Sequence, residues 1–294
     1  MTDNIPNLDK KLMTRSFGQA ASHYDDVAHL QREIATDLLD RLDFIKLTPQ
    51  TILDVGTGTG NVSRTLQQKY PKANIYSIDI ALPMLQQAKK HVVKSFFKRP
   101  KQHLICADTM QLPIKNNSVD LLISNLMLQW CDDIQTVFTE FARVLKPDGA
   151  LFFSTFGPDT LKELRQSWAD VDQYRHVNQF TDMHDIGDSL LQAGFTHPVM
   201  DVDWVVRYYQ KGMDLMHELK KLGAHNVTMQ RAPTFTGKTK LQTMLNHYEN
   251  YRQPQGLPAT YEVIYGHALG KHLNQFLHEE GAVGIPIHQI SHTK

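Results

Sequence analysis

The chain has 294 residues, of which 41% are hydrophobic and 21% charged, with 31 Lys and Arg against 31 Asp and Glu. A formal net charge of zero argues against a strongly basic nucleic-acid-binding protein, and the composition is that of an ordinary globular protein. No apolar run reaches the roughly 20 residues of a membrane-spanning helix, and residues 1–11 lack the apolar stretch of a secretory signal. We therefore expect a cytoplasmic protein with no membrane or nucleic-acid partner.

Residues 1–15 show no periodic pattern, and we expect them to be loosely ordered. Apolar residues then recur at helical spacing from Val27 to Leu42, which predicts one long amphipathic helix within an N-terminal helical cap at residues 16–46. At the other end, residues 271–294 form a weakly specified tail.

From residue 51 onward, short apolar runs alternate with amphipathic segments. The predicted strands are residues 51–55, 74–79, 103–107, 119–125 and 150–156. The helices between them are predicted at residues 61–69, 83–91 and 134–145. This alternation is typical of an α/β fold with a mostly parallel sheet and helices on both faces.

Two later strand candidates, residues 198–206 and 260–265, flank a mostly helical stretch at 213–251. We expect that stretch, with boundaries at about 207–255, to be a helical insertion that lies over the sheet as a cap. Residues 16–270 would then form a single domain.

The strongest motif is Leu53-Asp54-Val55-Gly56-Thr57-Gly58-Thr59-Gly60, between the first strand and the next helix. Gly56 and Gly58 allow the backbone to turn tightly and approach a ligand. Asn61 stands where the third glycine of a dinucleotide-binding fingerprint would be, so the pattern indicates a different nucleoside cofactor.

Polar residues also end the next three strands. Asp79, followed by Ile80, can accept hydrogen bonds from two ribose hydroxyls, and Asp108, beside Thr109, is placed to meet an adenine amino group. Asn125 and Leu126 end the fourth strand. Each carboxylate alone could cap a helix or a turn, but together they predict a cofactor site at the carboxyl edge of the sheet.

This arrangement resembles the class I methyltransferases, which have a Rossmann-like sheet of seven strands and use S-adenosylmethionine. The resemblance implies that Asp54 lies near the methionine part of the cofactor, Asp79 on the ribose and Asp108 on the adenine. Asn125-Leu126-Met127-Leu128 replaces the Asn-Pro-Pro-Tyr type of loop found where amines are methylated, which favours an oxygen or carbon acceptor. A carboxylate acceptor is ionised at pH 7, so no general base is expected.

Further segments are similar to the malonyl-[acyl-carrier protein] O-methyltransferases of biotin synthesis, the BioC family, over about residues 16–270. They include Ser16-Phe17-Gly18, Leu30-Gln31, Gln129-Trp130, Phe156-Gly157-Pro158, His176-Val177-Asn178, Leu222-Gly223-Ala224 and Pro258-Ala259-Thr260. The resemblance implies methylation of the free carboxyl of a malonyl thioester, which primes pimeloyl synthesis. BioC-like assembly factors that act on an arginine, and other carboxyl or oxygen methyltransferases, stay open as alternatives.

If the chain methylates a malonyl thioester, Tyr24 is a candidate to cover the methyl donor and orient the acceptor. Gln31 is a candidate to reach the methionine carboxylate. Either could equally be an ordinary residue of an amphipathic helix. A cation is expected to bind the malonyl carboxylate. The candidates are Arg165, His176, Lys220 and Lys221.

No metal is expected, because Cys106, Cys131 and the fifteen histidines show no ligand spacing. The expected partner is malonyl-acyl carrier protein, with malonyl-coenzyme A left open, as is the oligomeric state. An acidic carrier protein needs a basic surface, and we expect it in the insertion, not in the lysine-rich run at 89–101, which belongs to the opposite edge of the sheet. The expected docking lysines are Lys211, Lys220, Lys221, Lys238 and Lys240.

Overall fold

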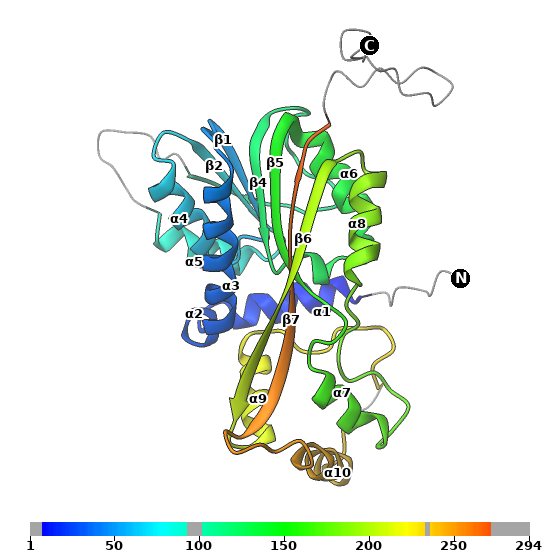
Figure 1. The fold of residues 1–294 in the computed structure, drawn as a ribbon. Coiled ribbons are helices and arrows are strands. Elements are labelled where there is room, and N and C mark those ends of the chain that lie inside the picture. The colour runs from blue at the N-terminus through cyan, green and yellow to red at the C-terminus, as the bar shows by residue number, and fades with distance from the viewer. Residues whose placement is uncertain (1–7, 93–101, 233–235, 272–294) are drawn as a thin grey trace, which may run out of the picture.

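The computed structural model describes residues 8–92, 102–232 and 236–271. Within these ranges, a seven-stranded sheet has the order β3-β2-β1-β4-β5-β7-β6 (Figure 1). The strands are β1 (Thr51–Val55), β2 (Asn74–Asp79), β3 (Gln102–Cys106), β4 (Val119–Asn125), β5 (Leu145–Phe156), β6 (Thr196–Tyr209) and β7 (Leu257–Leu269). Strands β1 to β5 are parallel, and β7 is antiparallel to both of its neighbours, so the predicted mostly parallel sheet is confirmed.

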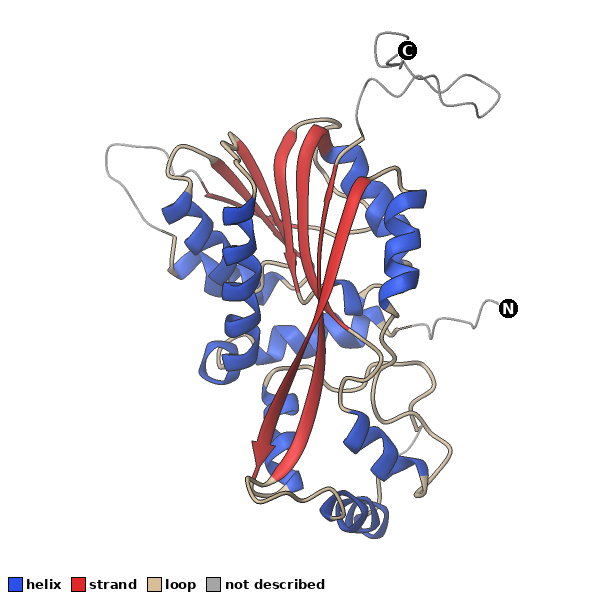
Figure 2. Ribbon diagram, viewed as in Figure 1, coloured by secondary structure: helices blue, strands red, loops and turns tan. Residues whose placement is uncertain are grey.

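Helices cover both faces of this sheet (Figure 2). They are α1 (Lys10–Ala20), α2 (Tyr24–Val27), α3 (His29–Asp40), α4 (Asn61–Lys69), α5 (Leu82–Lys90), α6 (Ile134–Val144), α7 (Lys162–Ala169), α8 (Met183–Gln192), α9 (Gly212–Lys221) and α10 (Lys238–Glu249). Two short 3-10 helices are η1 (Arg41–Phe44) and η2 (Leu128–Trp130).

Alternate residues of each strand face opposite sides of the sheet, and this alternation divides the core in two. Ile52 of β1 belongs to the apolar cluster that includes α3 and α4, whereas Leu53 belongs to the cluster that includes α6 and α8. Both are fully buried. The central strands are therefore covered on both sides, as expected for a parallel sheet.

The N-terminal region differs from the prediction. The single helix expected from Val27 to Leu42 is instead α3 followed by η1, and two more helices precede it. Helix α1 begins at Lys10, after Asp9 accepts a hydrogen bond from the backbone N–H of Leu12 at 2.9 Å. Residues 10–15 are therefore helical and not loosely ordered, while residues 1–7 lie outside the described ranges.

Strands β6 and β7 are longer than predicted, and this changes where the inserted helices lie. Strand β5 pairs with β7 only from Val263 onward, so the earlier residues of β7 pair with β6 alone. They form a two-stranded ribbon that projects beyond the sheet (Figure 2). Helices α7, α9 and α10 gather around this ribbon at one end of the molecule and do not lie over the sheet face, contrary to our expectation.

No helix within the described ranges combines the length and the apolar character needed to cross a membrane.

Candidate active site

The glycine-rich loop after β1 opens onto a cavity at the carboxyl edge of the sheet. Gly56 and Gly58 have φ angles of 77° and 56°, in the left-handed region that favours glycine. A Cβ on Gly56 would overlap the side chain of Met127, whereas one on Gly58 would have no atom within 4 Å. Gly58 therefore leaves open space beside the loop, where a ligand can approach the backbone.

Asp79, at the end of β2, is the carboxylate that holds this loop in place. Its Oδ2 accepts a hydrogen bond from the Gly58 N–H and its Oδ1 one from the Ala81 N–H, both at 2.8 Å. Burial raises the pKa of Asp79, while these backbone donors favour the ionised form. Each carboxylate oxygen has a second lone pair, so Asp79 can still accept hydrogen bonds from hydroxyls in the cavity.

Almost all of the residues expected to contact the cofactor line this one cavity. They are Tyr24, Gln31, Gly56, Gly58, Asp79, Ile80, Asp108, Thr109, Asn125 and Leu126. They come from α2, α3 and the ends of four strands, so the fold brings together residues that are far apart in the sequence.

Asp54 is the exception. Its Oδ2 accepts hydrogen bonds from Thr57 Oγ1 at 2.6 Å and from Ser63 Oγ at 2.5 Å, and its side chain is buried behind the loop. Burial raises the pKa of Asp54 to about 6. Asp54 therefore ties the loop to α4 and is not among the residues that line the cavity, and its place near the methionine part stays a prediction.

Two polar groups in the cavity are poised for a ligand. The Oε1 atom of Gln31 is buried and has no hydrogen-bond partner in the described structure, so it is an acceptor that a ligand ammonium would satisfy. Burial and the negative charge of Asp79 raise the pKa of Tyr24, so its hydroxyl stays protonated at neutral pH and acts as a donor.

A second cavity adjoins the first and extends towards α7 and α9. It is largely apolar, with walls that include Leu161, Leu164 and Trp168. The two cavities share part of their lining. The shared residues are Gln31, Gln129, Trp130, Phe156, Leu222 and Ala224.

The four candidates for binding the malonyl carboxylate do not meet at one place. His176 and Lys220 line the second cavity, but His176 is stacked on Trp168 and paired with Asp172 at 2.8 Å. Lys221 lines a separate outer groove. Arg165 lines none of the cavities described here, and its guanidinium donates to the carbonyl of Pro158 at 2.5 Å.

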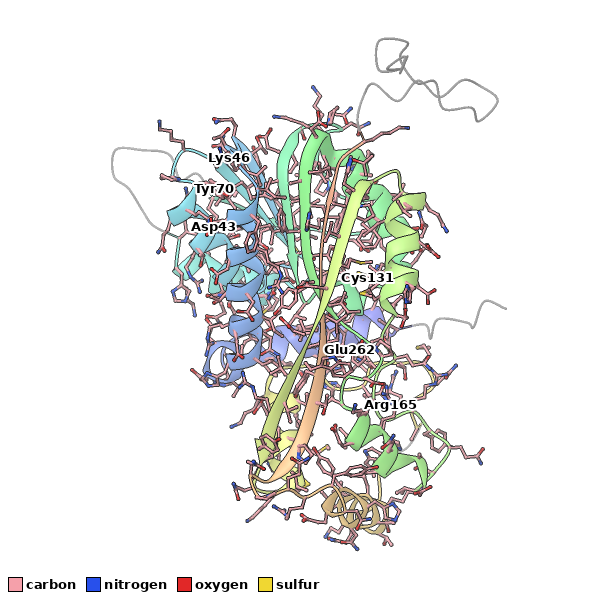
Figure 3. The ribbon with its side chains drawn as sticks, in the orientation of Figure 1. Asp43, Lys46, Tyr70, Cys131, Arg165 and Glu262 are labelled. Carbon is pink, nitrogen blue, oxygen red and sulfur yellow. The ribbon has the colours of Figure 1, made fainter. Side chains whose placement is uncertain are left out.

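Arg165 and Glu262 instead stabilise the loop that leads from β5 into α7 (Figure 3). Glu262, on β7, accepts a hydrogen bond from the Asp159 N–H at 2.7 Å, one residue after the carbonyl that Arg165 contacts. This loop begins at Gly157, directly after Phe156 at the junction of the two cavities. Both side chains therefore act on the shape of the second cavity without lining it.

Within the described residues, no cluster of three or more His, Cys, Asp or Glu side chains has an arrangement that could hold a metal ion. Burial raises the pKa of the Cys131 thiol, which lines the first cavity, to about 12, so it is not a thiolate at neutral pH.

Comparison with known proteins identifies the family. A malonyl-[acyl-carrier protein] O-methyltransferase from Gallionella capsiferriformans is 48% identical over 263 residues, which is 89% of this chain and 91% of the relative. One from Coxiella burnetii is 42% identical over 285 residues, 96% of each chain. The chain belongs to the malonyl-[acyl-carrier protein] O-methyltransferase family.

Other comparisons agree on the fold of this methyltransferase. Residues 53–153 match the family model described as a methyltransferase domain. A putative methyltransferase from Bacillus halodurans has a TM-score of 0.58 at 14% identity, covering 80% of this chain and 99% of that one. A Haemonchus contortus phosphoethanolamine N-methyltransferase, solved with S-adenosylmethionine, has a TM-score of 0.51 at 18% identity, covering 81% of this chain and 52% of its own.

S-adenosylmethionine is the cofactor of this methyltransferase. The residues of the first cavity fit it, because Asp79 offers lone pairs to two hydroxyls, Gln31 offers an unused buried acceptor, and Gly58 leaves the loop open. When bound, this cofactor supplies an electrophilic methyl group on a positively charged sulfur.

Sequence reasoning missed Lys10 and the rest of α1 in this methyltransferase. Lys10 Nζ lies 2.5 Å from Asp108 Oδ2, and Met13 and Phe17 also line the first cavity. Helix α1 is joined to the insertion, where Ser16 Oγ lies 3.1 Å from His225 Nε2. The signal in the sequence was the helix-capping Asp9 followed by apolar residues at helical spacing.

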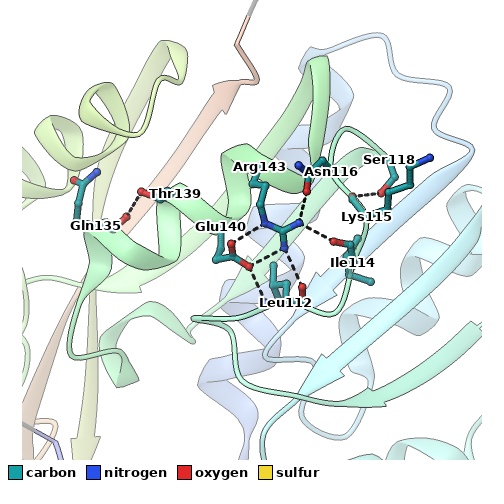
Figure 4. Close-up of polar contacts among 9 residues, drawn as sticks. All are labelled: Leu112, Ile114, Lys115, Asn116, Ser118, Gln135, Thr139, Glu140 and Arg143. Carbon is teal, nitrogen blue, oxygen red and sulfur yellow. Dashed lines mark hydrogen bonds and ion pairs between the residues drawn. The ribbon is translucent and has the colours of Figure 1, made fainter.

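Glu140 and Arg143 of α6 fix the later part of the loop between β3 and β4 (Figure 4). The Arg143 guanidinium bonds both oxygens of Glu140 and the carbonyls of Leu112 and Ile114, at 2.7–2.9 Å. Glu140 in turn accepts a hydrogen bond from the Leu112 N–H at 2.8 Å. The contacts of Arg143 are thus with this loop and with its own helix, α6.

Proposed function

We propose that this protein transfers the methyl group of S-adenosylmethionine to the free carboxylate of malonyl-acyl carrier protein, giving the malonyl methyl ester that primes pimeloyl synthesis for biotin. Its membership of the malonyl-[acyl-carrier protein] O-methyltransferase family supports this proposal. The observation that carries it is the common lining of the two cavities, because a cofactor in the first can meet an acceptor only where the two join.

The second cavity suits the acceptor. Its apolar wall fits the uncharged arm of an acyl thioester, and the acceptor oxygen is at the end of that arm. The carboxylate is already ionised at neutral pH, so the protein has to align it and exclude water, and no side chain has to remove a proton. Methylation then masks a charge that would be costly to bury in the apolar pockets of chain-elongating enzymes.

Alignment falls to the groups around the junction. The protonated Tyr24 hydroxyl is a donor on the cofactor side, and α1 covers the first cavity through Met13 and Phe17. Because α1 is joined to the insertion, the two together shield both cavities from water.

The carrier protein is proposed to dock where Lys220 and Lys221 lie. The five lysines that we expected to form one docking surface are divided, because Lys211 and Lys221 stand at opposite ends of α9, about 15 Å apart. Lys240 is paired with Asp172 at 2.9 Å. Lys220 lines both the second cavity and the outer groove, so this end of α9 is beside the entrance for the thioester arm.

We also propose that residues 16–270 act as one catalytic domain in the cytoplasm, where acyl thioesters of the carrier protein are made. Malonyl-coenzyme A shares the malonyl thioester and is a second possible substrate for direct comparison.

Methyl transfer itself tests the proposal. The purified protein is incubated with S-adenosylmethionine carrying a labelled methyl group and with malonyl-acyl carrier protein, malonyl-coenzyme A or acetyl-acyl carrier protein, and the products are analysed by mass spectrometry. We expect label on the malonyl carrier protein, released by an esterase, and none on the acetyl form. Absence of label from both malonyl thioesters would overturn the proposal.

A further inference from the structure

The junction between the two cavities contains no charged side chain. The residues that line both cavities are two glutamines, a tryptophan and three apolar residues, all in the described part of the chain. None of the four expected cations is therefore among the residues that line both cavities, where the carboxylate has to meet the methyl group. Another kind of donor has to hold it there.

Gln129 and Trp130 supply such donors. The Oε1 atom of Gln129 accepts a hydrogen bond from Thr155 Oγ1 at 3.2 Å, which fixes the orientation of the amide. The N–H groups of this amide donate to no acceptor among the described residues. The indole N–H of Trp130 likewise has no protein acceptor there, and its ring is fixed by an edge-on contact with Phe17 at 5.0 Å. The side chain of Gln31 lines the same junction.

We propose that the side chains of Gln129 and Trp130, assisted by Gln31, form an uncharged carboxylate-binding site at the junction, which selects acyl groups that end in a free carboxylate. This inference rests on the proposed function, because it concerns the same acceptor. Amide and indole N–H groups donate hydrogen bonds to both carboxylate oxygens without adding a positive charge.

An uncharged site suits the charge change of the reaction. A carboxylate oxygen forms a bond to the methyl carbon as the bond from that carbon to sulfur breaks, so a negative oxygen and a positive sulfur both become neutral. A lysine beside the carboxylate would stabilise the starting state more than the transition state and would slow the reaction. Uncharged donors orient the carboxylate with a smaller penalty of this kind.

The nearby lysines and His176 each line one of the two cavities but not both, and some of them are already paired. Lys10, in the first cavity, is paired with Asp108, and His176, in the second, is paired with Asp172. Lys220 lines the second cavity and the outer groove but not the first cavity. Its position suits the carrier protein or its arm, not the reacting carboxylate.

The test compares binding of malonyl-acyl carrier protein and acetyl-acyl carrier protein to the protein saturated with S-adenosylhomocysteine. In Gln129→Leu and Trp130→Phe variants saturated with S-adenosylhomocysteine, we expect affinity for the malonyl form to fall roughly 10- to 100-fold, while affinity for the acetyl form changes little. The matched controls are Gln192→Leu and Trp204→Phe, at exposed positions on α8 and β6, which should retain the preference for the malonyl form.

A Lys220→Met variant separates this site from a cationic one. We expect it to weaken binding of both carrier proteins equally and to keep the preference for the malonyl form. Loss of that preference in Lys220→Met, with the preference intact in Gln129→Leu and Trp130→Phe, would overturn the inference. If the unaltered protein methylates neither malonyl thioester, the proposed function itself fails, which is a distinct result.

Discussion

Two aspartates of similar sequence context do different work around the glycine-rich loop. Asp54 is buried behind the loop and bonds only to Thr57 and Ser63, whereas Asp79 bonds the loop backbone and also lines the cofactor cavity. The difference comes from where each strand ends relative to the cavity. It leads to separate predictions for stability and for cofactor binding.

For Asp54, we predict a pH-dependent cost to stability. Its pKa of about 6 is above the ordinary value of 3.8, so the folded protein keeps a proton that the unfolded chain releases as the pH rises from about 4 to 6. Stability from this group is therefore present at low pH and lost as the pH rises through that range, by about 1 to 3 kcal/mol.

Urea unfolding of the unaltered protein and of an Asp54→Asn variant measures this pH dependence of the unfolding free energy. Between about pH 5 and about pH 7.5, the difference in unfolding free energy should shift in favour of the variant, because asparagine does not ionise. A difference that stays constant with pH would contradict the assignment.

For Asp79, we predict a loss of cofactor affinity. Replacement by asparagine removes a charged acceptor for the ribose hydroxyls, and the Kd for S-adenosylhomocysteine should rise roughly 10- to 100-fold by calorimetry. Asp43→Asn is the matched control, because Asp43 pairs only with Lys69 on the surface. An unchanged Kd in Asp79→Asn would place the ribose elsewhere.

The sequence predicted Asp79, Asp108 and Gly58 correctly as cavity residues because strand ends and glycine turns are local features that depend on the parallel sheet alone. It did not predict the contacts of Arg165, because the direction of its guanidinium depends on a loop that β7 holds in place from about 100 residues away. Such a long-range contact leaves no pattern near Arg165.

At the scale of elements, β5 and β7 pack closely where Gly266 faces Phe153. Gly266 of β7 pairs with Phe153 of β5, and a Cβ at position 266 would overlap the buried Phe153 ring. The close approach lets β7 continue past the sheet into the ribbon that carries the insertion. Only glycine fits there.

A Gly266→Ala variant should therefore be less stable by about 1 to 3 kcal/mol, measured by thermal or urea unfolding, because a buried aromatic ring has to move. Gly237→Ala is the control. Its Cβ would have no atom within 4 Å, and we expect a change within about 0.5 kcal/mol. Equal effects of the two substitutions would show that β5 and β7 are not tightly packed at Gly266.

The elements that the sequence predicted least well are α1 and the ribbon. Helix α1 is short and is stabilised by contacts with the insertion, such as the hydrogen bond from the Asp9 N–H to the carbonyl of Val227 at 2.8 Å. The ribbon consists of the last residues of β6 and the first residues of β7, which pair with each other and not with β5. Both depend on tertiary contacts that periodicity does not reveal.

For the whole molecule, the division of the lysines along α9 gives a prediction about the carrier protein. Replacing Lys220 and Lys221 by methionine should raise the KM for malonyl-acyl carrier protein roughly three- to tenfold and raise the KM for malonyl-pantetheine less, because only the former brings an acidic surface. The same change at Lys211, at the other end of α9, and at Lys238, the first residue of α10, should have little effect. Equal effects of the two double variants on steady-state kinetics would contradict docking at this end of α9.

The zero net charge of the chain is thus compatible with local charge that guides a partner, while the reacting groups meet in an uncharged junction. The most direct measurement is a crystal structure with S-adenosylhomocysteine and a malonyl-pantetheine analogue in which an amide replaces the thioester and so resists hydrolysis. We predict that the ribose hydroxyls lie on Asp79 and that the malonyl carboxylate lies about 3 Å from the side-chain N–H groups of Gln129 and Trp130. A carboxylate bound to Lys220 or Arg165, or a pantetheine arm outside the second cavity, would contradict it.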